Sequence, residues 1–284
     1  MEHEWTVAEL VAQLRNDGGV RPGDILIVHS SAKEIGRAEN GPSATVRALK
    51  EAVGPEGTLL LPVFSSPPAD GIFKIKRTPS RVGLITEAFR RSEGVKRSMH
   101  PTHSVAAWGK RAEEFLAGHE NTSALGPDSP FHKAAKAGAK ILMIGCDFTT
   151  LSLIHVGEAL AQVPWFGKGP VYGGYEKPLT LIDYEGKEHP YVPYNTPGDS
   201  VAFVNFQHEM ERLGKISLFK VGDAETMVFD AATCLNVTVE MLQKDPGLAL
   251  CKKSNCPVCV GAWTFVEQAQ KPKGQGGCQC GCHK

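Results

Sequence analysis

The sequence predicts an α/β protein in which a central mixed, largely parallel sheet is flanked by helices on both faces, a three-layer αβα arrangement. Two observations support this class. Short, wholly apolar runs of strand length alternate with amphipathic helical segments, and the connections between them are short. The chain has 284 residues, which is enough to bury a sizeable core. We expect a single α/β domain over residues 1–250 and a Cys-rich C-terminal tail over residues 251–284.

The N-terminal half supplies the alternating elements. Thr6 and Glu9 form a capping box that starts the first helix. Continuous apolar runs indicate strands that are buried on both faces, a pattern typical of parallel sheets, over residues 25–28, 58–61 and 140–144. A further strand is expected over residues 104–108, and helices over residues 43–53, 83–91, 111–116, 130–137 and 150–162.

The pattern changes after Trp165. Residues 179–184 and a second strand-like run ending at Tyr194 are separated by Glu185 and Gly186, which predicts a β-hairpin insertion in the C-terminal half. Beyond it we expect a helix over residues 200–213, strands over residues 217–221 and 226–229, and a last helix over residues 231–242. The last dozen residues are rich in Gly, Gln, Lys and Cys, and we expect disorder there unless a metal orders them.

Charge and composition exclude several classes of function. The 31 basic and 31 acidic side chains cancel, so no global field attracts nucleic acid or an anionic membrane. The N-terminus carries Glu2, Glu4 and Glu9 and lacks the apolar segment of a secretory signal. No uncharged apolar run is long enough to span a bilayer. We therefore expect a cytoplasmic protein.

The segment that follows the first predicted strand, His29-Ser30-Ser31-Ala32, is a candidate ligand site. Ligands of open α/β sheets bind at the carboxyl ends of strands, and free backbone N–H groups in such a loop can hold phosphate oxygens. The segment is neither a Walker loop nor a dinucleotide glycine pattern. A polar turn without a ligand is the alternative.

A second polar segment, His100-Pro101-Thr102-His103-Ser104, leads into the strand expected over residues 104–108. Two histidines three residues apart can bind metal, exchange protons or hydrogen-bond locally. No nucleophile elbow surrounds Ser104, so the sequence does not mark it as a nucleophile.

His155 and Glu158 form the third candidate. On a helix, residues i and i+3 share a face. A carboxylate beside an imidazole stabilises the protonated ring and makes it a stronger base, which suits the removal of a proton from an amine. The alternative is a pair with a structural role only.

The cysteines divide into two groups. Cys146 and Cys234 lie in apolar surroundings and are expected to be buried thiols. The other six fall between residues 251 and 282, where clustering in a chain without a signal peptide favours metal ligands over disulfides. Candidate ligands of a structural zinc ion are Cys251, Cys256 and Cys259, with Cys278, Cys280, Cys282 and His283 as further donors.

Taken in order and spacing, these segments resemble the aminoglycoside 3-N-acetyltransferase family over most of the chain, from the first helix to about Leu242. The matching elements are Gly23-Asp24, Val28 to Ser31, Gly57-Thr58, Arg97-Ser98, His100-Pro101, Ser104, Leu125-Gly126, Ser129-Pro130, His155, Glu158, Val221 to Ala224 and Val228 to Asp230.

The resemblance implies an enzyme that transfers acetyl directly from acetyl-CoA to the 3-amino group of an aminoglycoside, with no metal in the chemistry. It implies that His155 is the base, assisted by Glu158, and that His100 lies near the thioester or the acceptor. The CoA site would include His29, Ser30, Ser31, Ala32, Ser104 and Val105. The partners are then acetyl-CoA and a small-molecule amine, and a homodimer is a candidate assembly.

Three alternatives stay open. Residues 70–81 carry four cations that would repel an aminoglycoside and favour a neutral or anionic amine, unless they hold the 3′-phosphate of CoA or face water. Carboxylates that could serve a polycation are Asp147, Asp183, Glu185, Glu188 and Asp199. A metal-dependent hydrolase would use His100, His103, His155 and Glu158 as ligands. A non-catalytic scaffold would work through its Cys-rich tail.

Overall fold

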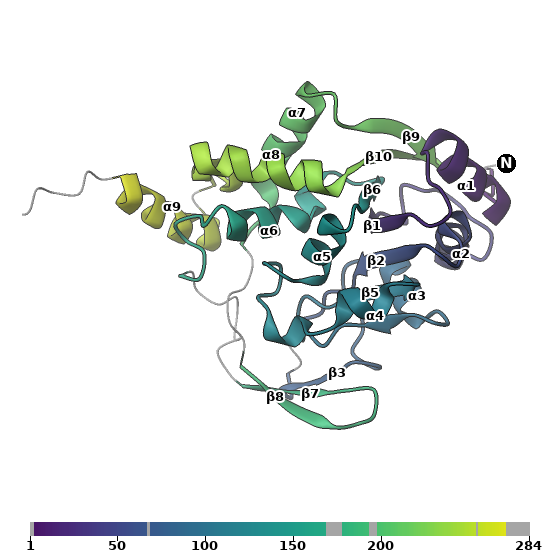
Figure 1. The fold of residues 1–284 in the computed structure, drawn as a ribbon, viewed down its shortest axis with the longest axis horizontal. Coiled ribbons are helices and arrows are strands. Elements are labelled where there is room, and N and C mark those ends of the chain that lie inside the picture. The colour runs from purple at the N-terminus through teal and green to yellow at the C-terminus, as the bar shows by residue number, and fades with distance from the viewer. Residues whose placement is uncertain (1–2, 67–68, 169–177, 193–197, 254, 271–284) are drawn as a thin grey trace, which may run out of the picture.

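The computed structural model describes residues 3–66, 69–168, 178–192, 198–253 and 255–270. A seven-stranded sheet runs through its centre in the order β4-β5-β2-β1-β6-β10-β9 (Figure 1). Its strands are β1 (Ile25–Ser30), β2 (Thr58–Pro62), β4 (Lys96–Arg97), β5 (Val105–Gly109), β6 (Lys140–Ile144), β9 (Ser217–Val221) and β10 (Ala224–Asp230).

Strand direction within this sheet confirms one part of the prediction and corrects another. The sheet is mixed, as expected. It is not largely parallel, because only β1 pairs in parallel, with β2 and with β6, whereas the pairs β2–β5, β4–β5, β6–β10 and β9–β10 are antiparallel. A continuous apolar run indicates that a strand is buried on both faces, but it does not indicate whether the strand runs parallel or antiparallel to its neighbours.

Helices flank the sheet. Alternate residues of one strand belong to different core clusters: Ile27 of β1 packs in one, and Leu26 and Val28 in the other. The second cluster includes residues of α1 (Val7–Ala12), α2 (Pro42–Val53) and α3 (Leu84–Arg91). The first includes residues of α4 (Ala112–Leu116), α5 (Pro130–Lys136), α6 (Leu153–Leu160), α7 (Val204–Arg212), α8 (Ala231–Lys244) and α9 (Pro257–Gln270).

Local sequence explains how the helices begin and pack. The capping box of Thr6 and Glu9 is present at α1, as predicted. Gly157 lets α6 approach α8 closely, because a Cβ atom at this position would lie 2.4 Å from the Thr238 Cγ2 atom. This close packing fixes the helix that contains His155 and Glu158.

A small second sheet lies beside the main one in Figure 1. It contains β3 (Ile72–Lys74), β7 (Leu179–Ile182) and β8 (Glu188–Tyr191). β7 and β8 are antiparallel, and β3 pairs in parallel with β7. The strand β3 was not predicted, because its partner lies more than a hundred residues away in sequence. The predicted end of the second run, at Tyr194, is outside the described residues.

The helix α9 was also not predicted. It extends to the end of the molecule opposite α1 (Figure 1). Its residues Cys259, Ala262 and Val266 are buried in the same core cluster as α8. Residues 278–283, with their three cysteines and His283, are outside the described residues. Within the described ranges, no helix is both long enough and apolar enough to cross a membrane.

Candidate active site

A cavity of about 270 Å³ lies where the parallel strands β1, β2 and β6 end. This is the edge at which ligands of open α/β sheets bind. The lining residues come from the ends of these strands and the segments that follow them, from α3 and the residues before it, from residue 103 before β5, from the loop between α4 and α5, from α6, and from residues 198 and 200. They are His29, Ser30, Pro62, Phe64, Val82, Thr86, His103, Leu125, Cys146, Thr149, Thr150, Leu151, Ser152, His155, Gly198 and Ser200.

His155 and Glu158 form a buried pair at this cavity. The His155 Nδ1 atom lies 2.6 Å from the Glu158 Oε2 atom, and the two residues are 8% and 4% exposed. A carboxylate only accepts hydrogen bonds, so Nδ1 carries a proton and donates a hydrogen bond to Glu158. The Nε2 atom of His155 is therefore the nitrogen that is left for a ligand. The predicted pairing of these two side chains on one helical face is present in the structure.

The position of the His155 ring follows from the elements around it. Asp147 accepts a hydrogen bond from the Thr149 backbone N–H at 2.9 Å and caps a short 3₁₀ turn after β6. α6 begins directly after this turn. Phe203 packs edge-on against the imidazole, with the ring centroids 4.8 Å apart. Packing on one side and the carboxylate on the other hold the ring in one orientation.

Two further histidines line the cavity. Burial lowers the pKa of His103 to about 3 and the pKa of His29 to about 4, so both rings are neutral near pH 7. The His103 pKa is lowered further by the neighbouring His155 and His119. The His29 Nε2 atom and the Ser30 Oγ atom are buried and have no hydrogen-bond partner among the described residues. Such polar atoms at a cavity wall suit a polar ligand.

His100 does not line the cavity. Its Nδ1 atom accepts a hydrogen bond from the His103 backbone N–H at 3.0 Å, so its Nε2 atom carries the proton and donates to the Tyr191 hydroxyl at 3.1 Å. Its ring also packs against His119, with the centroids 4.8 Å apart. Burial lowers the pKa of His100 well below its usual value. The geometry thus places His100 behind His103, where it supports the loop that presents His103.

Ser104 and Val105 are also placed away from the cavity, and both are fully buried. The Ser104 hydroxyl accepts a hydrogen bond from the Arg97 Nε atom at 2.7 Å and donates to the Val63 carbonyl at 3.1 Å. Arg97 donates further bonds to the carbonyls of Val63 and Thr78. Burial lowers the pKa of Arg97 to about 9. Ser104 therefore holds a buried cation instead of facing a ligand.

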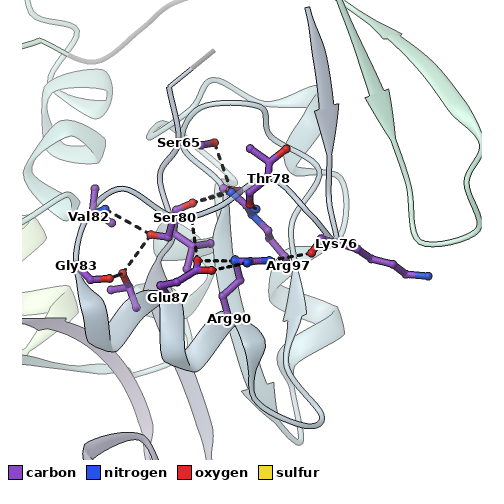
Figure 2. Close-up of polar contacts among 12 residues, drawn as sticks. Ser65, Lys76, Thr78, Ser80, Val82, Gly83, Glu87, Arg90 and Arg97 are labelled. Carbon is purple, nitrogen blue, oxygen red and sulfur yellow. Dashed lines mark hydrogen bonds and ion pairs between the residues drawn. The ribbon is translucent and has the colours of Figure 1, made fainter. Parts of the chain in front are cut away.

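Figure 2 shows how this network reaches the cavity wall. Glu87 of α3 forms a partly buried ion pair with Arg90 at 2.6 Å and accepts a hydrogen bond from the Ser80 backbone N–H at 2.9 Å. Arg90 in turn donates to the Lys76 carbonyl. These contacts fix the loop that leads to Val82 and Thr86. None of residues 70–81 lines the cavity, so the four cations of that loop do not face it.

A second cavity of about 250 Å³ lies on the other side of Ser31. It is lined by Ala32, Lys33 and the N-terminal residues of α2 and α3, among them Gly41, Pro42, Leu84 and Ile85. The first N–H groups of a helix have no partner within the helix, and its dipole favours an anion there. Two helix N-termini beside one lysine suit a phosphate group.

Sequence reasoning missed several residues that the structure brings together. His103 lines the cavity, whereas the family resemblance implied that His100 of the same segment lies near the thioester or the acceptor. Lys33 follows the predicted Ser30 and Ser31 directly, but it gave no signal of its own. Arg97 was named only as one of the residues that match the family, although its hydrogen bonds connect Ser104, Val63 and Thr78. Among the acidic candidates, Asp147 and Asp199 flank residues that line the cavity. The other three lie on or between β7 and β8.

The ligand set of the hydrolase alternative does not form. Both ring nitrogens of His100 are engaged by protein partners. Within the described ranges, the one group of three or more His, Cys, Asp and Glu side chains that could hold a metal ion is Asp199, Cys251, Cys256 and Cys259.

Fold and site together define an α/β protein with a His–Glu pair in a cavity at the carboxyl edge of its sheet. A family model described as aminoglycoside 3-N-acetyltransferase matches residues 27–243. The chain belongs to this family, which confirms the resemblance found in the sequence. Aminoglycoside N(3)-acetyltransferase IV of Salmonella sp is 35% identical over 191 residues, which cover 66% of this chain and 72% of that protein.

Another relative and two solved structures agree. Aminoglycoside N(3)-acetyltransferase III of Salmonella sp is 28% identical over 284 residues, which cover 90% of this chain and 95% of that protein. The crystal structure of the apoenzyme of aminoglycoside acetyltransferase AAC(3)-IVa has a TM-score of 0.77 at 26% identity and covers 93% of this chain and 99% of its own. AAC-IIIb in a binary complex with CoASH has a TM-score of 0.74 at 28% identity and covers 85% and 97%.

Proposed function

We propose that the protein transfers acetyl from acetyl-CoA to the 3-amino group of an aminoglycoside, with His155 as the general base. The observation that supports this most directly is the buried His155–Glu158 pair at a cavity at the carboxyl edge of the sheet. Family membership supports the class of reaction. The AAC-IIIb structure contains CoASH, and a mutant of AAC(3)-IVa has been crystallised in complex with a gentamicin.

The chemistry is a direct transfer within a ternary complex. The acceptor nitrogen attacks the thioester carbonyl carbon, and the Nε2 atom of His155 takes the proton that the nitrogen loses. The carbon–sulfur bond then breaks, and the CoA thiolate leaves and is protonated. Glu158 holds the Nδ1 proton and stabilises the imidazolium that forms. His103 is kept neutral by burial, so it does not repel that imidazolium.

Acetyl-CoA would extend across Ser31 from one cavity to the other. Phosphate groups would lie beside Lys33 and the N-termini of α2 and α3. The thioester would lie beside His29, Ser30 and His155. Ala32 lines the phosphate-side cavity, and Ser31 lies between the two. In this proposal Ser104, Val105 and His100 act as positioning residues, through Arg97 and His103, since the structure buries all three away from both cavities.

The charges at the cavity favour a cationic acceptor. No lysine or arginine is among the residues that line it in the described ranges. Asp147 is exposed and lies in the sequence between the lining residues Cys146 and Thr149. A polycation gains from such a carboxylate, whereas an anionic amine would be repelled. The alternative of an anionic acceptor depended on the loop 70–81, which does not reach this cavity.

A thiol-release assay tests the substrate class. With acetyl-CoA as donor, we expect the protein to release CoA thiol with gentamicin or apramycin as acceptor, and to release none above background with an anionic amine such as glutamate. Mass spectrometry of the product should show one added acetyl group. Release with the anionic amine and none with either aminoglycoside would contradict the proposed acceptor but would keep the transferase.

Lys33 offers a test of the proposed CoA position. Its side chain is exposed, so the loss of one charge-assisted contact is expected to be modest. We expect Lys33→Ala to raise the Kd for CoA about three- to tenfold by calorimetry, with a smaller effect at high salt. Lys215→Ala, on an exposed lysine beyond α7, is the matched control and should leave the Kd unchanged. If Lys33→Ala and Lys215→Ala bound CoA with the same Kd, the CoA phosphates would not lie beside Lys33.

Further parts of the sequence interpretation belong to this proposal. The two core clusters on opposite strand faces support the three-layer αβα description, and the antiparallel β7–β8 pair supports the inserted hairpin. We also propose a cytoplasmic location, where acetyl-CoA is made and used.

A further inference from the structure

Four ligand-type side chains converge at the start of α9, apart from the His155–Glu158 pair. They are Asp199, Cys251, Cys256 and Cys259, and their donor atoms all lie within 4.8 Å of one another. The Cys256 Sγ atom lies 3.0 Å from the Asp199 Oδ2 atom, and the Cys251 Sγ atom lies 3.8 Å from it. Cys251 and Cys259 are buried. The sequence grouped the three cysteines, but the carboxylate comes from a segment more than fifty residues earlier.

The geometry points to a structural zinc site with these four residues as ligands, and we propose that it anchors one wall of the active-site cavity. Thiolates and a carboxylate are ordinary zinc ligands. A tetrahedral ion with Zn–S bonds of about 2.3 Å places its sulfurs about 3.8 Å apart. The distances between the four donors therefore need to change by at most about 1 Å to surround one ion.

The polypeptide around the cluster is arranged to hold such a site in place. Cys256 and Cys259 flank Pro257 and Val258 at the first turn of α9, as in a zinc knuckle. The Trp263 indole N–H donates to the Cys251 carbonyl at 3.1 Å, so α9 holds the third cysteine as well. Gly247 lets the Trp263 ring approach, because a Cβ atom there would lie 2.6 Å from the indole. Lys252 and Lys253 are exposed and partly offset the negative charge of the ligand set.

Asp199 connects this cluster to the cavity. Its neighbours Gly198 and Ser200 both line the cavity. Ser200 donates a hydrogen bond to the carbonyl of Thr149, another lining residue. Gly198 faces Val258 of α9, since a Cβ atom at Gly198 would lie 3.8 Å from the Val258 Cγ1 atom. An ion held by Asp199 and α9 therefore fixes the wall that Gly198 and Ser200 form. The effect on acceptor binding rests on the proposed function, whereas the metal site does not.

Metal content of the full-length protein is the first test. We expect one equivalent of zinc per chain by mass spectrometry, lost in C256S/C259S and in Asp199→Ala, and retained in Asp199→Cys, which restores a ligand. The matched control is the triple variant C278S/C280S/C282S, which removes the terminal cysteines and should keep one equivalent. Where C256S/C259S does not fold, cobalt substitution of the wild-type protein decides. Thiolate-to-cobalt charge transfer and tetrahedral d–d bands are expected.

Several results would overturn the site. The site would be refuted if the wild-type protein bound neither zinc nor cobalt, or if zinc were lost only in C278S/C280S/C282S. It would also be refuted if two of the three cysteines formed a disulfide under reducing conditions. If zinc is bound as proposed, Asp199→Ala should raise KM for gentamicin several-fold more than it raises KM for acetyl-CoA. An unchanged KM for gentamicin would refute the anchoring role while the metal site stands. If the wild-type protein binds zinc but transfers no acetyl group, the proposed function is refuted and the metal site stands.

Discussion

Replacing His155 with alanine is expected to lower kcat for acetyl transfer about 10²- to 10⁴-fold, the range typical of losing a general base. His155 lines the cavity in which donor and acceptor would meet, and its Nε2 atom is the ring nitrogen that does not contact Glu158. The Kd for CoA should change little, because the proposed phosphate contacts lie in the other cavity. Steady-state kinetics with gentamicin and calorimetry with CoA measure the two effects.

The controls separate a base from a packing residue. His132→Gln alters a histidine of α5 that lines neither of the two proposed substrate cavities, so activity should be retained. Glu158→Gln keeps a hydrogen-bond acceptor for the Nδ1 proton but removes the charge, so we expect a smaller loss of kcat than in His155→Ala. A His155→Ala protein that loses CoA affinity in the same proportion as kcat would show that this residue binds the donor.

Acid sensitivity is the second large expected effect. His29, His100, His103 and His119 are buried, and burial lowers the pKa of each ring, to about 4 for His29 and His119, to about 3 for His103 and well below its usual value for His100. The unfolded chain titrates near pH 6.5. Because the pKa of each ring is lower in the folded than in the unfolded protein, the unfolded chain binds protons first as pH falls. The free energy of unfolding is therefore highest above pH 6.5 and decreases as pH falls towards the folded pKa.

The magnitude follows from that linkage. Each ring costs about 1.4 kcal/mol of unfolding free energy per pH unit below its unfolded pKa. At pH 5 the loss is on the order of 2 kcal/mol per ring and 8 kcal/mol for four, comparable with the whole stability of a typical domain. Guanidinium unfolding at several pH values should show stability that falls steeply between about pH 6 and pH 5.

His119 provides a variant for this prediction. Its Nε2 atom donates to the Ala124 carbonyl at 2.9 Å, so its Nδ1 atom accepts from the Ser98 hydroxyl at 2.7 Å. His119→Gln removes one titrating ring, and the slope of stability against pH should fall by about a quarter. The slope is the readout, so a general loss of stability does not obscure it. A stability that is flat from pH 7.5 to pH 5 in the wild-type protein would contradict the account.

Local signals in the sequence predict much of the fold. The strand over residues 140–144 and the helix over residues 83–91 agree with β6 and α3 to within one residue, because apolar runs and bounding glycines act locally. The errors are long-range. The direction of β10 against β6 and the pairing of β3 with β7 depend on partners far along the chain. The helix α9 was not predicted, because the clustered cysteines in this part of the sequence favoured a tail without regular structure.

The site shows the same division. His155 and Glu158 were predictable because a helix brings residues i and i+3 together. His100 and His103 could not be distinguished, since only the fold shows that one faces a cavity and the other a buried histidine cluster. Ser104 likewise appeared open to a ligand until Arg97 was found against its hydroxyl. Asp199 could not be assigned to the cysteines, because no spacing rule connects it with Cys251.

A crystal structure of the protein with CoA and gentamicin tests the central claim most directly. We expect the CoA sulfur and the acceptor 3-amino nitrogen to meet beside His155, with that nitrogen within hydrogen-bond distance of the Nε2 atom and about 3–3.5 Å from the position of the thioester carbon. A sulfur located in another part of the molecule, or a metal ion bound to the His155 ring, would contradict the proposal that this histidine is the base.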